Sequence, residues 1–259
     1  MQVLVIQNDP TSTVSLLGDY LQAAGAKLTT VKPHHGGKLP ESPEGFDGAI
    51  ILGGAQNAHD DARFPAFVPM LDLLRAFHSQ AKPLLGLCLG GQLMARAFGE
   101  KVRANEEFEF GYLPIEITPE GREDPLLKGL APRQRIMQWH EDTFGLPEGG
   151  VRLMTGATCV NQAFRFGKTA YAFQCHWEVS VENAKDWVEN FGHVIHDKLG
   201  ESKGAETVAR AKTEFEKYGR RATDFCRVAA QRWADLVTAA KQGIQDQKGD
   251  KNASGGRAA

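Results

Sequence analysis

The chain has 259 residues, and its 30 basic and 32 acidic side chains nearly cancel, which argues against nucleic acid or an acidic membrane surface as a partner. Its four cysteines have no CxxC or other metal-ligand spacing, no apolar run reaches the length of a membrane span, and the N-terminus does not have the pattern of a secretory signal. We therefore expect a reduced, cytoplasmic protein that binds no metal.

The first hundred residues alternate between short apolar runs and amphipathic segments. The runs predicted as buried strands are 3–7, 46–54 and 82–88, and the segments predicted as helices are 11–25, 67–80 and 91–99. Strands and helices that alternate through short glycine-rich connections indicate an α/β fold, with a mostly parallel sheet covered by helices on both faces. Ligands bind such sheets at the carboxyl ends of the strands.

The pattern changes after about residue 110. Residues 111–119 and 171–179 are predicted strands, and the stretch between them is rich in turns. From Lys203 to about Gly243, apolar residues recur every three or four positions and predict a long amphipathic helix. We therefore divide the chain into a domain of residues 1–200, a C-terminal helical extension of residues 201–245, and a tail of residues 246–259 that is expected to be disordered.

Cys88 lies where the third strand meets a helix, within the sequence GLCLGG. A tight turn of this kind needs small neighbours, and the related G-x-S-x-G turn lifts a nucleophile above a sheet next to a backbone N–H. The N-terminus of the following helix would favour a thiolate. The alternative is a buried structural cysteine, which is the common situation for a free cysteine.

A nucleophilic cysteine requires a base, and His176 is the candidate. In QCHWEV, His176 and Glu178 are two residues apart on a predicted strand, so their side chains would share one face. A carboxylate there would orient the imidazole that accepts the thiol proton. The pattern H-x-E alone would also fit an exposed polar strand face or two metal ligands, although no third ligand is evident.

Several segments together resemble the class I (triad) glutamine amidotransferases. They are ILGGAQNA, GLCLGGQLMARAFG, EFGYLPIEIT, DPLLKGL, QWHEDTFGLPEGGVRLMTGATCVNQAF and AFQCHWEV. They occur in order over about residues 3–180. Within the family, the chain is most similar to stand-alone proteins that resemble the amidotransferase domain of GMP synthase, a group that includes γ-glutamyl peptidases. The resemblance implies a flavodoxin-like sheet.

The resemblance implies a role for each matched catalytic position. Cys88 would attack a γ-glutamyl amide and form a γ-glutamyl thioester. His176 would act as base and then as acid, and Glu178 would hold the His176 ring. The backbone N–H groups of Leu89 and Gly54 would form the oxyanion hole.

Further positions would bind the substrate. Gln92 matches a position that helps to hold the glutamyl group, and the segment at Trp139 and His140 matches one that meets its α-amino and α-carboxylate ends through backbone atoms. Glu109 matches a recurrent acidic position to which we assign no role from sequence. The resemblance implies no cofactor.

The chain departs from the family pattern at three positions. The family strand usually reads Q-F-H-P-E, whereas here Cys175 replaces the phenylalanine and Trp177 replaces the proline. Strand alternation places both side chains on the face away from the site, and we expect Cys175 to be a small core residue. Ala55 replaces the proline that commonly follows the glycines of the oxyanion loop. These changes leave the triad intact but alter the expected shape of the pocket.

Three functions stay open from sequence. The first is a self-sufficient hydrolase or transferase that acts on glutamine or on a γ-glutamyl amide or peptide. The second is a glutaminase subunit that supplies ammonia to a separate synthetase, and the third is an inactive binding module on the same fold. The expected partner is therefore a small γ-glutamyl molecule, and both a synthetase and a second copy of the chain remain open as protein partners.

Overall fold

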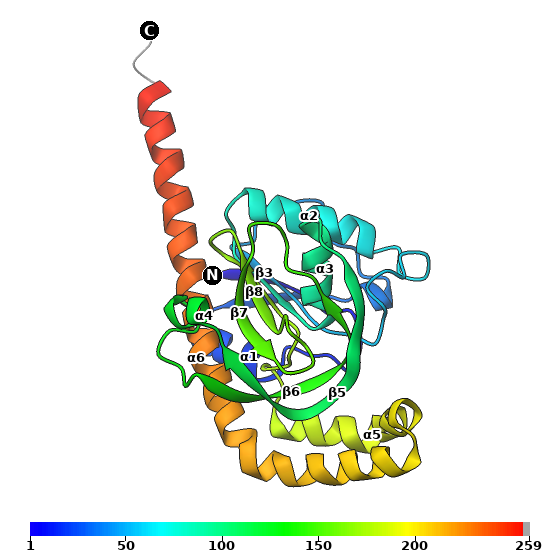
Figure 1. The fold of residues 1–259 in the computed structure, drawn as a ribbon. Helices are drawn as coiled ribbons and strands as arrows, with labels where there is room; N and C mark the ends of the chain where they lie inside the picture. The colour runs from blue at the N-terminus through cyan, green and yellow to red at the C-terminus, as the bar shows by residue number, and fades with distance from the viewer. Residues whose placement is uncertain (256–259) are drawn as a thin grey trace.

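A computed structural model describes the backbone of residues 1–255 and the side chains of residues 1–246 (Figure 1). Within this part, nine strands form one sheet in the order β2-β1-β3-β4-β9-β8-β7-β5-β6. The strands are β1 (Gln2–Ile6), β2 (Lys27–Val31), β3 (Gly48–Ile51), β4 (Leu84–Leu87), β5 (Val102–Ile117), β6 (Arg133–Phe144), β7 (Val151–Gly156), β8 (Ala163–Phe166) and β9 (Ala170–Phe173). The helices are α1 (Ser15–Ala23), η1 (Pro33–His35, a 3-10 helix), α2 (Phe67–Ser79), α3 (Leu89–Ala97), α4 (Pro119–Glu123), α5 (Val181–Leu199) and α6 (Glu201–Gly255).

The predicted α/β class is confirmed, and the sheet is mixed. Strands β2, β1, β3, β4 and β9 pair in parallel, while β9, β8, β7, β5 and β6 pair in antiparallel. In β1, β3, β4 and β9, four consecutive residues are buried, as expected for strands covered on both faces. The carboxyl ends of the parallel strands lie at one edge of the sheet, and Cys88 directly follows β4 at that edge.

Two apolar cores lie on opposite faces of the parallel strands. Alternate residues of β1 divide between them: Val3 and Val5 belong to one core, and Leu4 and Ile6 to the other. Helices α1 and α6 cover the first face, and α2 and α3 cover the second. The predicted arrangement with helices on both faces is therefore confirmed.

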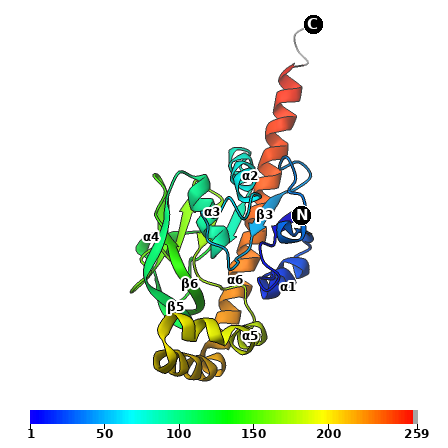
Figure 2. The same cartoon turned by 90° about the vertical axis from the view of Figure 1, so that its right-hand side faces the viewer.

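The C-terminal extension packs on the chain's own sheet. The apolar stripe of α6 that includes Phe225, Ala229 and Trp233 is buried in the same core as β1. Figure 2 shows α5 and the first part of α6 below β5 and β6, and the last turns of α6 reach beyond the sheet. The segment expected to be a disordered tail continues α6 as far as Gly255, and residues 256–259 lie outside the described part.

Some elements differ from the sequence expectation. The stretch expected to be rich in turns contains β6, β7 and β8. Strand β2 has the exposed, polar sequence KLTTV at the edge of the sheet, so it has no apolar run to reveal it. The strand predicted over 171–179 ends at Phe173. Among the described residues, no helix combines the length and apolar character needed to cross a bilayer.

Candidate functional site

Cys88 occupies a strained turn between β4 and α3. Its φ of 49° and ψ of −112° place a residue other than glycine in a region that L-amino acids rarely adopt. Two backbone hydrogen bonds hold it there: its N–H donates to the Phe173 carbonyl (2.8 Å), and its carbonyl accepts from the Gln92 N–H (3.0 Å). The turn therefore fixes the sulfur above the ends of β4 and β9.

The glycines around Cys88 allow α3 to approach the sheet. A Cβ atom on Gly90 would lie 2.0 Å from the Ile51 carbonyl oxygen, and one on Gly86 would lie 2.6 Å from the Gly90 carbonyl oxygen. A Cβ on Gly91 would lie 2.8 Å from the Phe173 carbonyl oxygen. These close contacts are with backbone atoms, so neighbouring side chains cannot relieve them by rotating. The glycines therefore set the position of the cysteine turn.

Substituting Gly90 with alanine is expected to lower stability by about 2 kcal/mol, because overpacking against a fixed carbonyl forces the helix away from the sheet. For a chain of this size, that corresponds to a fall of roughly 4–8 °C in the unfolding midpoint measured by calorimetry. Gly192→Ala in α5 is the control. Nothing lies within 4 Å of the added methyl group, so its helix propensity should stabilise the chain slightly. Equal midpoints for the two variants would contradict this packing.

His176 and Glu178 lie close together although the strand has already ended. An isolated β-bridge with β6 holds the backbone of His176, whose main-chain N–H donates to the Met137 carbonyl (2.8 Å). His176 Nδ1 lies 2.8 Å from Glu178 Oε1, and the two residues are 4 % and 2 % exposed. The expected pairing is therefore present, and the bridge to Met137, rather than a continuous strand, positions the histidine.

The electrostatics of His176 favour its charged form. Burial lowers its pKa, but the Glu178 carboxylate and the Cys88 sulfur outweigh burial and raise the pKa to about 10. Such an imidazole retains a proton beside the sulfur at neutral pH. A cysteine and histidine of this kind form the pair used for nucleophilic catalysis.

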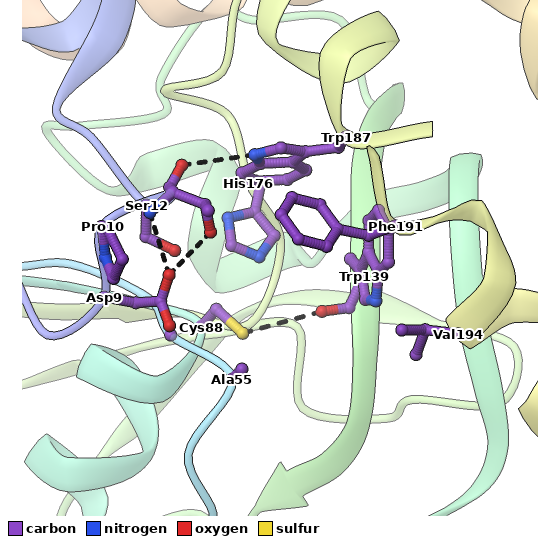
Figure 3. A pocket seen from close by; sticks show the side chains of 12 residues that line it. Asp9, Pro10, Ser12, Ala55, Cys88, Trp139, His176, Trp187, Phe191 and Val194 are labelled. Atoms are coloured by element: carbon purple, nitrogen blue, oxygen red, sulfur yellow. Dashed lines mark hydrogen bonds between the residues drawn. The ribbon is translucent and has the colours of Figure 1, made fainter. Parts of the chain in front are cut away.

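Cys88 and His176 line one cavity of about 340 Å³ (Figure 3). Gly53 packs against both residues, since an added Cβ would lie 3.0 Å from His176 Cε1 and 3.5 Å from Cys88 Cβ. The ring of Trp187 packs edge-on against the imidazole with a centroid separation of 5.1 Å. The sulfur also lies 3.8 Å from the Trp139 carbonyl oxygen.

The two residues expected to supply the oxyanion donors, Gly54 and Leu89, lie next to one another. Leu89 is the first residue of α3, and the first N–H groups of a helix have no intrahelical acceptor. Gly54 lines the cavity, and a Cβ built on it would lie 3.1 Å from the Leu89 side chain. In the described part of the chain, neither N–H has a hydrogen-bond acceptor. Their role as oxyanion donors stays a prediction.

A second, smaller cavity of about 150 Å³ adjoins the first, and Cys88 lines both. Gln92, Trp139 and His140, the three residues expected to bind substrate, all line it. Gln92 is 4 % exposed, and its Nε2 donates to the Asp142 carbonyl and to Gln174 Oε1, both at 3.3 Å. The structure thus brings the expected substrate residues together beside the cysteine.

Glu109 belongs to a buried network beneath the smaller cavity. His140 Nε2 lies 2.8 Å from Glu109 Oε2, Gln162 Nε2 donates to the same oxygen (2.9 Å), and the Thr158 hydroxyl donates to Oε1. Burial raises the pKa of Glu109, but these hydrogen bonds outweigh it and hold the pKa below its ordinary value. The network fixes the part of β6 that borders the cavity.

Three residues of this region have ligand atoms close enough together to hold a metal ion. The ligand atoms of Glu109, His140 and Cys159 lie within 4.8 Å of one another. Both ring nitrogens of His140 already face oxygen atoms, with Asp142 O 2.9 Å from Nδ1, so a metal ion would break one of these hydrogen bonds. Burial raises the pKa of Cys159 to about 12, which keeps the thiol protonated. The donor set therefore fits a hydrogen-bonded support better than an ion site.

The structure also shows where the predicted core residue lies and reveals residues near Cys88 that were not predicted. Cys175 is buried in the core on the side of α6, as predicted, and Trp177 is buried in the same core. Three site residues were not predicted from the sequence: Gln174, whose Nε2 lies 3.6 Å from the Cys88 sulfur, and Trp187 and Phe191 of α5. The apolar face of α5 was the available signal for the last two.

Comparison with known proteins agrees with this geometry. The pattern of the family described as glutamine amidotransferase class-I matches residues 5–195. The glutamine amidotransferase-like protein YfeJ of Salmonella typhimurium is 28% identical over 189 residues, which cover 71% of this chain and 79% of YfeJ. One of the subunits of the glutamine-hydrolysing GMP synthase of Methanosarcina barkeri is 32% identical over 156 residues, or 59% of this chain and 74% of that polypeptide.

Solved structures share the fold. A glutamine amidotransferase from Thermotoga maritima superposes with a TM-score of 0.78 at 24% identity, covering 90% of this chain and 98% of that one. One from Methylobacillus flagellatus has a TM-score of 0.80 at 23% identity, covering 91% and 94%. With the family pattern spanning most of the sequence, the chain belongs to the class I glutamine amidotransferase family.

Proposed function

We propose that this chain hydrolyses the γ-glutamyl amide bond of glutamine or of a γ-glutamyl amide or peptide through a thioester on Cys88. The observation that carries the proposal is the contact of three buried groups at a strained turn: the Cys88 sulfur, the His176 imidazole and the Glu178 carboxylate. Residues in these roles, found on unrelated folds, cleave acyl groups. Transfer of the same acyl group to an amine would use the same intermediate.

The first half of the reaction would release the amine. The Cys88 sulfur attacks the γ-carbonyl carbon while its proton resides on His176, and the carbonyl oxygen becomes an oxyanion that accepts from the N–H groups of Gly54 and Leu89. His176 then gives its proton to the amide nitrogen, the C–N bond breaks, and the amine leaves. The product on the enzyme is the γ-glutamyl thioester.

The second half would restore the thiol. Water gives one proton to His176 as its oxygen attacks the thioester carbonyl, the C–S bond breaks, and the sulfur recovers a proton from His176. Glutamate is released. Glu178 holds the ring of His176 and stabilises the imidazolium formed in both halves.

A second candidate is a glutaminase subunit that supplies ammonia to a separate synthetase. The similarity to proteins named as subunits of glutamine-hydrolysing GMP synthases supports it. An inactive binding module on the same fold is a third and weaker candidate, since all three triad residues are in contact. We also infer a cytoplasmic location, which the four free, buried thiols support.

Product release from the purified chain alone tests this proposal. Glutamine and γ-glutamyl ethylamide are incubated separately with the protein, and glutamate is measured with the released ammonia or ethylamine. Steady, multiple-turnover release of glutamate supports a self-sufficient hydrolase. Release of at most one equivalent per chain would contradict self-sufficiency and favour the glutaminase subunit.

Treatment with a metal chelator such as EDTA is expected to leave the rate of glutamate release unchanged, because the triad contains no step that needs a metal ion. The same assay is run on untreated protein and on protein dialysed against EDTA. Loss of activity that one added divalent ion restores would contradict the triad mechanism. It would direct attention to the Glu109–His140–Cys159 group.

A further inference from the structure

We infer that the amine released from the substrate carries an apolar group, aromatic or long aliphatic and without a carboxylate, which the larger cavity binds. The inference rests on the proposed γ-glutamyl chemistry and names its substrate class. It follows from which cavity each catalytic group borders, from the composition of the cavity walls and from the charges that face them.

The acid catalyst determines the side on which the amine leaves. A group that protonates the leaving nitrogen must lie within hydrogen-bond reach of it. His176 borders the larger cavity and is absent from the residues that line the smaller one. The smaller cavity instead has polar side chains, among them Gln92, Asn57 and Lys198, which suit the charged end of a glutamyl group. The amine therefore departs into the larger cavity.

That cavity is much larger than glutamine requires. Ammonia is close in size to a water molecule, whose share of liquid volume is about 30 Å³. A cavity of about 340 Å³ lies within the range of small-molecule binding sites, about 300–1,000 Å³. The remaining volume can hold a substituent on the nitrogen.

One wall of this cavity is apolar and belongs to regular elements. Trp187, Phe191 and Val194 follow the spacing of one face of α5, and Trp139 of β6 packs beside them (Figure 3). The Trp139 ring lies 5.8 Å from that of Trp187 and 6.5 Å from that of Phe191 between centroids. Trp187 is fixed further by its Nε1–H, which donates to the Thr11 carbonyl (3.3 Å). Such rigid aromatic walls favour an apolar occupant.

The charges disfavour an amine that carries a carboxylate. Among the described residues lining this cavity there is no lysine or arginine, and Asp9 contributes a carboxylate. Thr11 satisfies one oxygen of that carboxylate through its N–H (2.9 Å) and hydroxyl (2.7 Å). The charge of His176 is matched by Glu178 behind it. An amino acid as leaving group would therefore place its carboxylate near Asp9 without a cation to balance it.

The test compares kcat/KM for four γ-glutamyl compounds that differ only in the amine. These are the amides of phenethylamine, phenylalanine and 1,4-diaminobutane, and glutamine itself. We expect the phenethylamide to exceed each of the others by about ten-fold or more, from burial of its ring against the aromatic wall and the absence of a carboxylate. A phenylalanine or diaminobutane compound cleaved as well as the phenethylamide would overturn the inference, as would a preference for glutamine.

Two α5 variants connect the preference to the cavity. Phe191→Ala should reduce the ratio of kcat/KM for the phenethylamide over glutamine by about ten-fold, because the cavity loses one aromatic wall. Glu189→Ala, an exposed residue of the same helix, should leave that ratio unchanged. An unchanged ratio in Phe191→Ala would contradict the assignment of the cavity.

A binding measurement separates failure of this inference from failure of the proposed function. Trp139 and Trp187 line the cavity, so ligand binding should change tryptophan fluorescence in Cys88→Ala, which cannot turn over. Tighter binding of γ-glutamyl phenethylamide than of γ-glutamyl phenylalanine supports the inference even if the wild-type chain cleaves neither. Equal binding of both would overturn it, even if glutamine is hydrolysed.

Discussion

Replacing Cys88 with alanine or serine is expected to reduce turnover of every γ-glutamyl compound by about 10⁴-fold or more, because no other group can form the thioester. The fold should persist. The side chain is only 6 % exposed, but the turn is held by backbone hydrogen bonds to Phe173 and Gln92 that the substitution leaves in place. Rates of glutamate release and the thermal midpoint are measured on the same preparations.

Cys226→Ala provides the matched control for this prediction. Cys226 is also a free, buried cysteine, but it lies in the apolar core between α6 and the sheet. Its removal should cost a little stability and no more than about two-fold in kcat. Full activity in either Cys88 variant would refute the mechanism.

Substituting His176 with alanine is expected to cost more than substituting Glu178 with glutamine. The first change removes both base and acid and should lower kcat by about 10⁴-fold, whereas the second removes a positioning group and should lower it by about 10²-fold. Steady-state kinetics of the two variants and of the wild-type chain measure this difference. Equal or reversed losses would mean that the two roles are misassigned.

Glu178→Gln should also alter the pH dependence. The Glu178 carboxylate is the strongest influence that raises the pKa of His176, so its removal should lower that pKa from about 10. The limb of the kcat/KM profile that reports deprotonation of His176 should then move to lower pH. A residue with a purely structural role would leave this limb in place.

The parallel half of the fold could be predicted because each of its buried strands and main helices has a recognisable pattern within its own short segment of sequence. Strands β1, β3 and β4 are short apolar runs, with glycines soon after β3 and Cys88 directly after β4. Helices α2 and α6 have clear apolar stripes. The antiparallel half has weaker signals. In β6, polar and apolar residues are mixed because the strand borders the site, and the exposed edge strand β2 needs few apolar residues.

The meeting of His176 with Glu178 near Cys88 could be predicted because a triad restricts the residue types that can form it, but the surrounding shape could not. His176 and Glu178 meet as expected, although the chain has left the strand and is held by Met137. The aromatic wall depends on how α5 packs after residue 180, and the Glu109 network depends on β5, β6 and the segment at Thr158 meeting in space. Neither arrangement is encoded in a local pattern.

Whether Cys88 is the nucleophile can be decided by intact-protein mass spectrometry after reaction with 6-diazo-5-oxo-norleucine, a glutamine analogue that alkylates such a residue. Peptide mapping then locates the adduct. We predict one adduct per chain, on Cys88, and none in Cys88→Ala. An unmodified Cys88, or an adduct on another residue, would contradict the assignment of Cys88 as the nucleophile.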